Sequence, residues 1–160
     1  MKRIAIQGEL GSFHDITAHQ YFEGEQIELI CCATFEEVFE NIKRDPTVVG
    51  ICAIENTIAG SLLHNYELLR QSGTTVVGEH KLHIEHSICC LPDDDWNTLQ
   101  EVHSHPVALM QCGKFLANHP DLKAVEAEDT AGSAAYIAQH KVHGWAAICS
   151  SYAAQMYGMK

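Results

Sequence analysis

The sequence has few basic residues: Lys and Arg number 10 against 21 Asp and Glu, and the formal net charge is −11. A nucleic-acid surface needs clustered cations that neutralise phosphates, so we expect no DNA or RNA partner. The same deficit argues against an anionic membrane surface. No apolar run approaches the roughly 20 residues that a membrane-spanning helix needs. The start, Met1 to Gly8, has no secretion signal, and these absences together predict a cytoplasmic protein without a membrane partner.

Sequence motifs for nucleotides, metals and nucleophilic serines are also missing. Gly8-x-x-Gly11 lacks the third glycine of a dinucleotide fingerprint and the Lys-Ser/Thr pair of a phosphate-binding P-loop. No G-x-S-x-G segment occurs. His103 and His105 would share one strand face, but no third ligand accompanies them. The acidic run Asp93 to Asp95 has no ligand spacing, so we interpret it as a solvated loop rather than a cation site.

The seven cysteines form no C-x-x-C or zinc-ribbon spacing. Two vicinal pairs occur, and neighbouring residues in a strand point to opposite faces. We interpret all seven as reduced core residues: Cys31, Cys32, Cys52, Cys89, Cys90, Cys112 and Cys149.

What the sequence does contain is an ordinary globular composition, 46% hydrophobic and 19% charged, in which short apolar runs alternate with amphipathic stretches. The apolar runs predict strands, mostly parallel and buried on both faces. They are 4–7, 27–31, 48–54, 76–78, 84–91, 102–103, 124–127 and 146–149. Between them Thr34-Phe35-Glu36-Glu37 is a capping box that opens a helix ending at Asp45-Pro46. A further helix is predicted to begin at Pro106. Thr130 is predicted to cap the next helix, and Ser150 or Ser151 the last.

The connection from Thr74 to Leu91 contains no helical pattern, and it divides the β-α-β-α series in two. We therefore expect an α/β fold of two lobes, residues 1–78 and 79–160, with a cleft between them. In such sheets a ligand binds beyond the carboxyl ends of the strands, where helix N-termini present free N–H groups.

Four strand-end corners carry glycine or small hydroxyl residues where an anion could approach the backbone closely. They are 8–13, 55–61, 104–106 and 129–133. Each corner, taken alone, is also compatible with an ordinary cap or turn. The second is the most unusual, because Glu55 and Asn56 place a carboxylate and an amide directly after an apolar run. Gly60 and Ser61 are predicted to begin the next helix there, and Glu55 could alternatively serve as a capping acid.

Taken together, these residues resemble the catalytic region of the prephenate dehydratase family. Residues 4–13 are similar to the family's opening strand and its Gly-Pro-x-Gly-Thr-Phe loop, with Glu9 in place of the proline. Residues 53–62 are similar to Pro-Ile-Glu-Asn-Ser-x-x-Gly-Ser-Val, and 104–112 to Ser-His-Pro-Gln-Ala-Leu-x-Gln-Cys. Asp129-Thr130-Ala131, the run 146–150 and Tyr157-Gly158-Met159 follow in the family's order.

The resemblance implies a type II periplasmic-binding-protein-like α/β fold whose interlobe cleft binds prephenate and forms phenylpyruvate in phenylalanine biosynthesis, with no metal and no organic cofactor. It implies catalytic roles for three residues: Glu55, Asn56 and Gln111. It implies substrate binding by eight others: Gly11, Ser12, Thr57, Gly60, Ser61, Ser104, His105 and Thr130. A homo-oligomer is expected for the full-length protein.

The family's Thr-Arg-Phe motif, its C-terminal return to the first lobe and its regulatory ACT domain would follow Lys160. We therefore expect a fragment that gains prephenate turnover when the extension is restored. Arogenate dehydratases share the same motifs and remain an alternative. So does a non-catalytic small-molecule-binding domain, for which the pattern of two lobes and a hinge is also suitable.

Overall fold

A computed structural model describes residues 1–160, which divide into two units. The first unit comprises Met1–Glu9 and Phe13–His83, and the second comprises Leu10–Ser12 and Ile84–Lys160. The chain therefore enters the second unit twice. It does so first for the three residues Leu10–Ser12, and then again from Ile84 to the end. No helix is long and apolar enough to cross a membrane.

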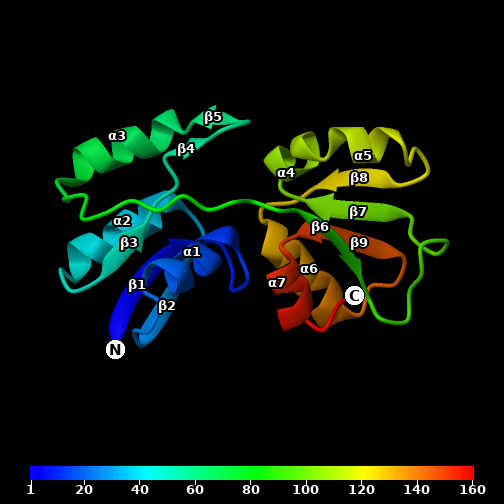
Figure 1. Cartoon of the computed structure of the whole chain (residues 1–160), viewed down its shortest axis with the longest axis horizontal. Coiled ribbons are helices and arrows are strands. Elements are labelled where there is room, and N and C mark those ends of the chain that lie inside the picture. The colour runs from blue at the N-terminus through cyan, green and yellow to red at the C-terminus, as the bar shows by residue number, and fades with distance from the viewer. The chain divides into compact units, whose positions relative to one another are not determined.

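The first unit is built on a parallel three-stranded sheet of order β2-β1-β3 (Figure 1). Its strands are β1 (Lys2–Gln7), β2 (Ile27–Cys32) and β3 (Val49–Ile51). Its helices are α1 (Phe13–Tyr21), α2 (Phe35–Arg44) and α3 (Leu63–Ser72). A two-stranded hairpin, β4 (Glu55–Asn56) with β5 (Gly60–Ser61), precedes α3.

Both faces of this sheet are covered, because successive residues of β1 point to opposite sides. Ile4 and Ile6 pack with Phe22 next to α1, whereas Ala5 packs with Val38 of α2. Each fully buried isoleucine stabilises the fold by roughly 1.5–3 kcal/mol. The predicted parallel sheet with burial on two sides is confirmed for this unit.

The second unit contains a four-stranded sheet of order β6-β9-β7-β8. Its strands are β6 (Ser87–Cys90), β7 (Glu101–Ser104), β8 (Lys123–Glu126) and β9 (Trp145–Cys149). Its helices are α4 (Pro106–Gln111), α5 (Gly113–Ala117), α6 (Thr130–His140) and α7 (Ser151–Met156). β7 is parallel to β8 and β9, but β6 is antiparallel to β9, so the prediction of parallel strands is wrong for β6.

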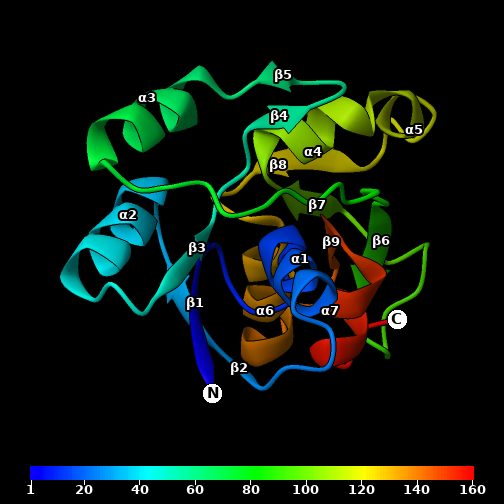
Figure 2. The same ribbon diagram turned by 60° about the vertical axis from the view of Figure 1, so that its left-hand side comes forward.

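Helices cover both faces of this second sheet, α6 and α7 one face and α4 and α5 the other (Figure 2), and each face has its own hydrophobic cluster. Cys89, Ala147 and Cys149 point toward α6 and α7 and pack with Ile137 and Ala153. The intervening strand residues pack with α4 and α5: Cys90, Val102, Ala146 and Ile148 contact Ala108, Leu109, Phe115 and Leu116. Each face thus has its own layer of helices.

Several predicted strands are shorter than expected or absent. Residues 76–78 form no strand, and Val76 and Val77 are 64% and 75% exposed, because β-branched residues make a strand only where a neighbouring strand can pair with them. β3 ends at Ile51, three residues before the apolar run does. All seven cysteines are free thiols, as expected, but Cys31 is exposed and is therefore not a core residue.

Candidate functional site

In each unit the order of the strands reverses at one point of the sheet. In the first unit β1 lies between β2 and β3, with α1 and α2 on opposite faces. In the second unit β7 lies between β9 and β8, with α4 and α6 on opposite faces. At such a point the helices that follow the strands lie on opposite faces of the sheet. Ligands of α/β folds bind there, beyond the carboxyl ends of the strands.

The loop 55–61 is a tight hairpin rather than the start of a helix. Glu55 pairs with Ser61 and Asn56 with Gly60 in antiparallel register, and α3 begins only at Leu63. The prediction that Gly60 and Ser61 open the helix is therefore wrong. Gly60 has φ +87, a left-handed conformation that glycine adopts without strain, and this allows the chain to turn back. Thr57 lies exposed at the tip.

The amide oxygen of Asn56 holds the tip of this hairpin. Its Oδ1 accepts hydrogen bonds from the N–H groups of Ile58 and Ala59, both at 2.9 Å. This is an Asx-type turn, in which a short side chain replaces a backbone acceptor. Oδ1 is therefore engaged within the hairpin, and the other hydrogen-bonding group of this side chain, its Nδ2 amide, is a donor.

The carboxylate of Glu55 is held at one of its two oxygens. Oε1 accepts hydrogen bonds from Tyr66 Oη at 3.0 Å and from Ser61 Oγ at 3.2 Å. Oε2 has no hydrogen bond from the protein, and Glu55 is exposed. Burial and then the hydrogen bond to Glu55 raise the pKa of Tyr66 above its usual value, so the phenol stays protonated and donates. Tyr66, eleven residues beyond Glu55 in the chain, was not predicted as a site residue.

In the second unit Ser104 and His105 follow β7 directly, but their side chains serve the fold. Ser104 is fully buried, and its Oγ donates to the carbonyl oxygen of Ile148 at 2.6 Å, joining β7 to β9. His105 is the N-cap of α4, with Nδ1 accepting from the N–H of Val107 at 3.2 Å. This bond leaves the second ring nitrogen of His105 to donate.

Gln111, the last residue of α4, contacts a histidine that was not predicted as a site residue. His86 Nε2 lies 2.7 Å from Gln111 Oε1, and both residues are partly buried. The carbonyl oxygen of the amide accepts, so the histidine donates through Nε2. Oε1 of Gln111 is therefore engaged with His86. His86 precedes β6, 25 residues earlier in the chain.

The corner at Gly11 and Ser12 packs inside the second unit. A Cβ on Gly11 would lie 2.9 Å from Cβ of Ala153 and 3.7 Å from Cβ of Ala131. Ser150 Oγ donates to the carbonyl oxygen of Gly11 at 2.9 Å, and Ser12 is 3% exposed. The structure thereby brings this corner next to the first turns of α6 and α7.

Thr130 lies at the same end of this unit, but its role in the helix differs from the prediction. The N-cap of α6 is Asp129, whose Oδ1 accepts from the N–H of Gly132, and Thr130 is the first helical residue. The capping prediction for Thr130 is therefore wrong. Aspartate is a strong N-cap because its carboxylate accepts a free N–H and faces the positive end of the helix dipole. The Thr130 hydroxyl, partly exposed, is not used in the cap.

His14, in the first turn of α1, was also not predicted. Its Nε2 is buried without a hydrogen-bond partner, and its ring packs edge-on against Phe35 with 5.4 Å between ring centroids. Burial lowers the pKa of His14 to about 4, against a smaller opposing effect of its hydrogen bond to the backbone of Gln7. His14 is therefore neutral at pH 7.

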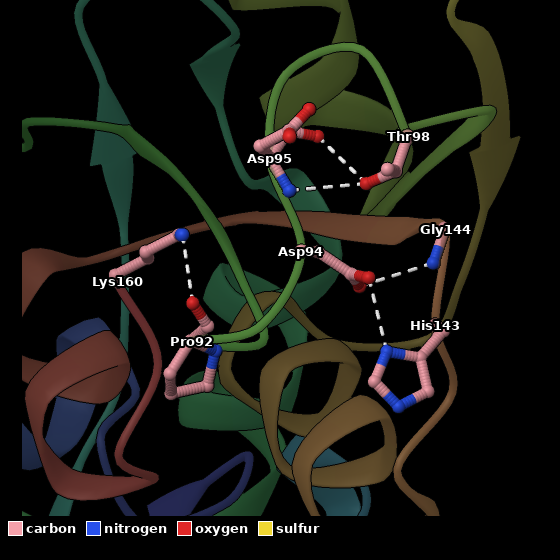
Figure 3. A network of polar contacts seen from close by, with 7 residues as sticks. All are labelled: Pro92, Asp94, Asp95, Thr98, His143, Gly144 and Lys160. Atoms are coloured by element: carbon pink, nitrogen blue, oxygen red, sulfur yellow. Dashed lines mark hydrogen bonds and ion pairs between the residues drawn. The ribbon is translucent and has the colours of Figure 1, made fainter.

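The acidic run 93–95 is only partly the solvated loop that was predicted (Figure 3). Asp93 and Asp95 are exposed, but Asp94 is 4% exposed. Its two carboxylate oxygens lie 3.0 Å from His143 Nδ1 and 3.0 Å from the Gly144 nitrogen. Burial opposes ionisation, but these hydrogen bonds outweigh it and hold the pKa of Asp94 below its usual value. Asp94 thus anchors the turn before β9.

The predicted site residues fall into two sets, one in each unit. The first unit contains the hairpin set: Glu55, Asn56, Thr57, Gly60 and Ser61. The second unit contains the remainder: Gly11, Ser12, Ser104, His105, Gln111 and Thr130. Of the second set, the Gly11 corner and the start of α6 are in contact through Ala131.

A family model described as prephenate dehydratase matches residues 4–160. The bifunctional chorismate mutase/prephenate dehydratase of Escherichia coli K12 is 32% identical over 160 residues, covering 99% of this chain and 42% of that protein. Arogenate dehydratase 1 of Petunia hybrida is 34% identical over 159 residues, covering 99% of this chain and 37% of that protein. The chain therefore spans less than half the length of these curated relatives.

Two solved structures have the same fold as this chain. Prephenate dehydratase from Arthrobacter aurescens, in complex with L-Phe, superposes with a TM-score of 0.88 at 19% identity, covering 99% of this chain and 53% of that one. A protein described as GqqA, a novel type of quorum quenching acylase, superposes with a TM-score of 0.85 at 28% identity, covering 99% and 57%. The predicted fold class, a two-lobed α/β fold of the periplasmic-binding-protein kind, is confirmed by these likenesses.

Proposed function

Because the chain belongs to the prephenate dehydratase family, we propose that the protein it forms is a carbon–oxygen lyase that converts prephenate to phenylpyruvate in L-phenylalanine biosynthesis. The observation that carries this proposal is the family match over residues 4–160, which includes every candidate corner. The hairpin supports it, since its carboxylate and amide are held in place before any ligand binds.

The reaction needs positioned polar groups and one proton. The carbon–carbon bond to the ring carboxylate breaks, carbon dioxide leaves, and the electron pair moves into the ring. The ring hydroxyl then departs and takes up a proton to become water. Because the ring becomes aromatic, no electron sink is required, and the proposal includes neither a metal nor an organic cofactor. A protein accelerates such a step by orienting the leaving groups and by donating hydrogen bonds or a proton to the departing oxygen.

The available groups suggest how each residue acts. Glu55 offers Oε2 as an acceptor, which suits the ring hydroxyl of the substrate. Asn56 and Gln111 are the proposed hydrogen-bonding residues for the carboxylates of the substrate, since an amide N–H donor suits a carboxylate oxygen. The proposed binding residues supply hydroxyls and backbone N–H groups: Gly11, Ser12, Thr57, Gly60, Ser61, Ser104, His105 and Thr130. Of these, Ser61, Ser104 and His105 contribute through position, because Ser61 Oγ, Ser104 Oγ and His105 Nδ1 are engaged.

The proposal extends to the setting of the protein. We place it in the cytoplasm, as a homo-oligomer at full length, with prephenate as its small-molecule partner. The strongly acidic composition supports the absence of nucleic-acid partners.

Phenylpyruvate formation tests the proposal. The complete gene product and the 160-residue chain are each mixed with prephenate, and product is followed by its absorbance. We expect turnover by the complete product, and a rise in the thermal unfolding midpoint of the 160-residue chain with prephenate. A complete product that neither turns over nor binds prephenate would falsify the assignment. Equal activity of the two forms would contradict the expectation that the C-terminal extension is needed.

Arogenate is the nearest alternative substrate, favoured by the 34% identity to the Petunia arogenate dehydratase. Arogenate differs from prephenate by an amine in place of the side-chain ketone. Side-by-side kcat/KM values for the two substrates decide between them, because that ratio measures discrimination directly.

A second candidate activity comes from the 28% identity to the quorum quenching acylase. Its test is the release of a free acid from an acylated quorum-sensing signal by the same protein preparation. A third candidate, a binding domain without catalysis, predicts a thermal shift with prephenate but no product from either substrate.

A further inference from the structure

The start of α3 is fixed to the chain on the other side of the 55–61 hairpin. Asn65 is 2% exposed, and its Nδ2 donates to the carbonyl oxygen of Ala53 at 2.7 Å. The N–H of Leu62 donates to the carbonyl oxygen of Ile54 at 2.8 Å. A buried side-chain hydrogen bond of this kind is costly to break, because the acceptor would be left without a partner. These two hydrogen bonds therefore hold the first turn of α3 in place relative to Glu55.

Tyr66 follows Asn65 directly, and this anchoring brings its hydroxyl to the carboxylate. Tyr66 Oη lies 3.0 Å from Glu55 Oε1, and Ser61 Oγ approaches the same oxygen at 3.2 Å. Two O–H donors on one oxygen restrict the carboxylate to one orientation, in which Oε2 is left to accept from a ligand. Both donors come from segments whose backbones are themselves held, Ser61 by β5 and Tyr66 by α3.

We infer that Tyr66 is a positioning residue for Glu55, with Ser61 as the second donor, and that together they aim Oε2 at the hydroxyl of the substrate. This inference rests on the proposed function. It assigns Glu55 the role of a hydrogen-bond acceptor that orients the substrate hydroxyl, rather than that of the proton donor. An oriented acceptor increases the rate by holding the leaving group in a reactive geometry. Tyr66 acts through Glu55 and needs no contact with the substrate.

The test compares Tyr66→Phe with wild type in the complete gene product, with prephenate as the probe. Phenylalanine keeps the ring and removes only the hydroxyl. We expect kcat to fall about 5- to 10-fold, the effect of about one lost hydrogen bond, with KM changed less than about twofold. Tyr136→Phe is the matched control: it is a helical tyrosine of similar exposure, 51% against 40%, in the second unit. Its activity should equal that of wild type.

A second pair of variants separates positioning from a general effect on folding. If Tyr66 acts through the carboxylate, Tyr66→Phe should reduce turnover in the wild-type background and cause no further loss in a Glu55→Gln background. Ser61→Ala should follow the same rule with a smaller effect, since its bond is longer. The thermal midpoints of all variants are measured alongside.

Three results would overturn the inference. The first is unchanged kcat in Tyr66→Phe, and the second is an undiminished effect of Tyr66→Phe in the Glu55→Gln background; both leave the proposed function standing. The third is a wild-type protein that neither binds nor turns over prephenate, which removes the proposed function and this inference together.

Discussion

At the scale of single residues, the polar side chains with the clearest roles are those whose partners are distant in the chain. Asp94 accepts from His143 and Gly144, about 50 positions later, and this fixes the turn before β9 (Figure 3). Ser104 can be fully buried because its hydroxyl donates a hydrogen bond to the carbonyl oxygen of Ile148. A buried hydroxyl or carboxylate is tolerated only where such partners exist.

His14 gives a prediction for the pH dependence of stability. Burial lowers its folded-state pKa to about 4, whereas the unfolded chain has a value of about 6.5. The unfolded state therefore binds more protons between these two values. Stability is at its full value above pH 6.5 and is lost as the pH falls from 6.5 to 4, by roughly 2–3 kcal/mol.

Urea unfolding at several pH values checks this expectation. In His14→Phe the loss of stability between pH 6.5 and 4 should be clearly smaller than in wild type, whatever the absolute stability. His140→Phe, at an exposed position, should keep the wild-type slope. The same slope in His14→Phe as in wild type would show that His14 is not the buried neutral group.

At the scale of helices and strands, local sequence signals decide where an element begins, and distant partners decide where it continues. α2 begins at Phe35 because Thr34 Oγ1 accepts from the Glu37 N–H at 3.3 Å. Glu37 returns the interaction by accepting from the Ala33 N–H at 2.8 Å. Both bonds lie within five residues. The capping-box pattern predicts the first from sequence, whereas the second goes to the N–H one residue before the cap rather than to that of Thr34.

Thr34→Ala should therefore destabilise the protein by about 1 kcal/mol, the typical value of an N-cap side chain. The denaturant midpoint of urea unfolding, followed by circular dichroism, measures it. Thr75→Ala is the control, because Thr75 is exposed and lies outside any helix or strand. Equal midpoints for the two variants would mean that the cap contributes nothing measurable.

Elements whose signals are local can be predicted from this sequence, whereas elements that depend on contacts with distant residues cannot. The sequence predicts β1, β2, β9 and the start of α2, where apolar runs and caps are local signals. It misplaces the strand at 76–78, because pairing depends on a neighbour that sequence does not reveal.

The same limit applies to the candidate site. Motif and strand-end reasoning selects Glu55 and Asn56, but it does not show that Asn56 Oδ1 is already occupied within its own loop. It also misses Tyr66 and His86, which reach their partners across 11 and 25 residues. Sequence periodicity cannot predict such contacts, because they depend on how the helices and strands that carry the two residues pack in the fold.

At the scale of the whole molecule, the two structural units are not two consecutive segments of the chain. Leu10–Ser12 belong to the second unit although they lie between β1 and α1 of the first. Tyr157 Oη donates to the carbonyl oxygen of Leu10 at 2.7 Å, and Ser150 Oγ donates to that of Gly11 at 2.9 Å. The second unit is therefore complete only when the N-terminal tenth of the chain is present.

Two glycine substitutions test this division. Gly11 and Gly24 have similar left-handed backbones, with φ +89 and +82, so alanine adds a similar strain of about 1 kcal/mol at each. Around Gly24 nothing lies within 4 Å of an added Cβ, but at Gly11 it would lie 2.9 Å from Cβ of Ala153. We expect Gly11→Ala to cost about 1–3 kcal/mol more, because close-packed atoms must move.

Two buried thiols can report which of the two units a glycine substitution destabilises. Cys149 is 0% exposed in the second unit, and Cys32 is 3% exposed in the first. A thiol reagent modifies each only when the surrounding core opens, so labelling against urea reports each unit separately. Gly11→Ala should lower the labelling midpoint of Cys149 more than that of Cys32, and Gly24→Ala should do the reverse. If Gly11→Ala instead exposes Cys32 first, the segment at Leu10–Ser12 stabilises the first unit, and the division of the chain into these two units is wrong.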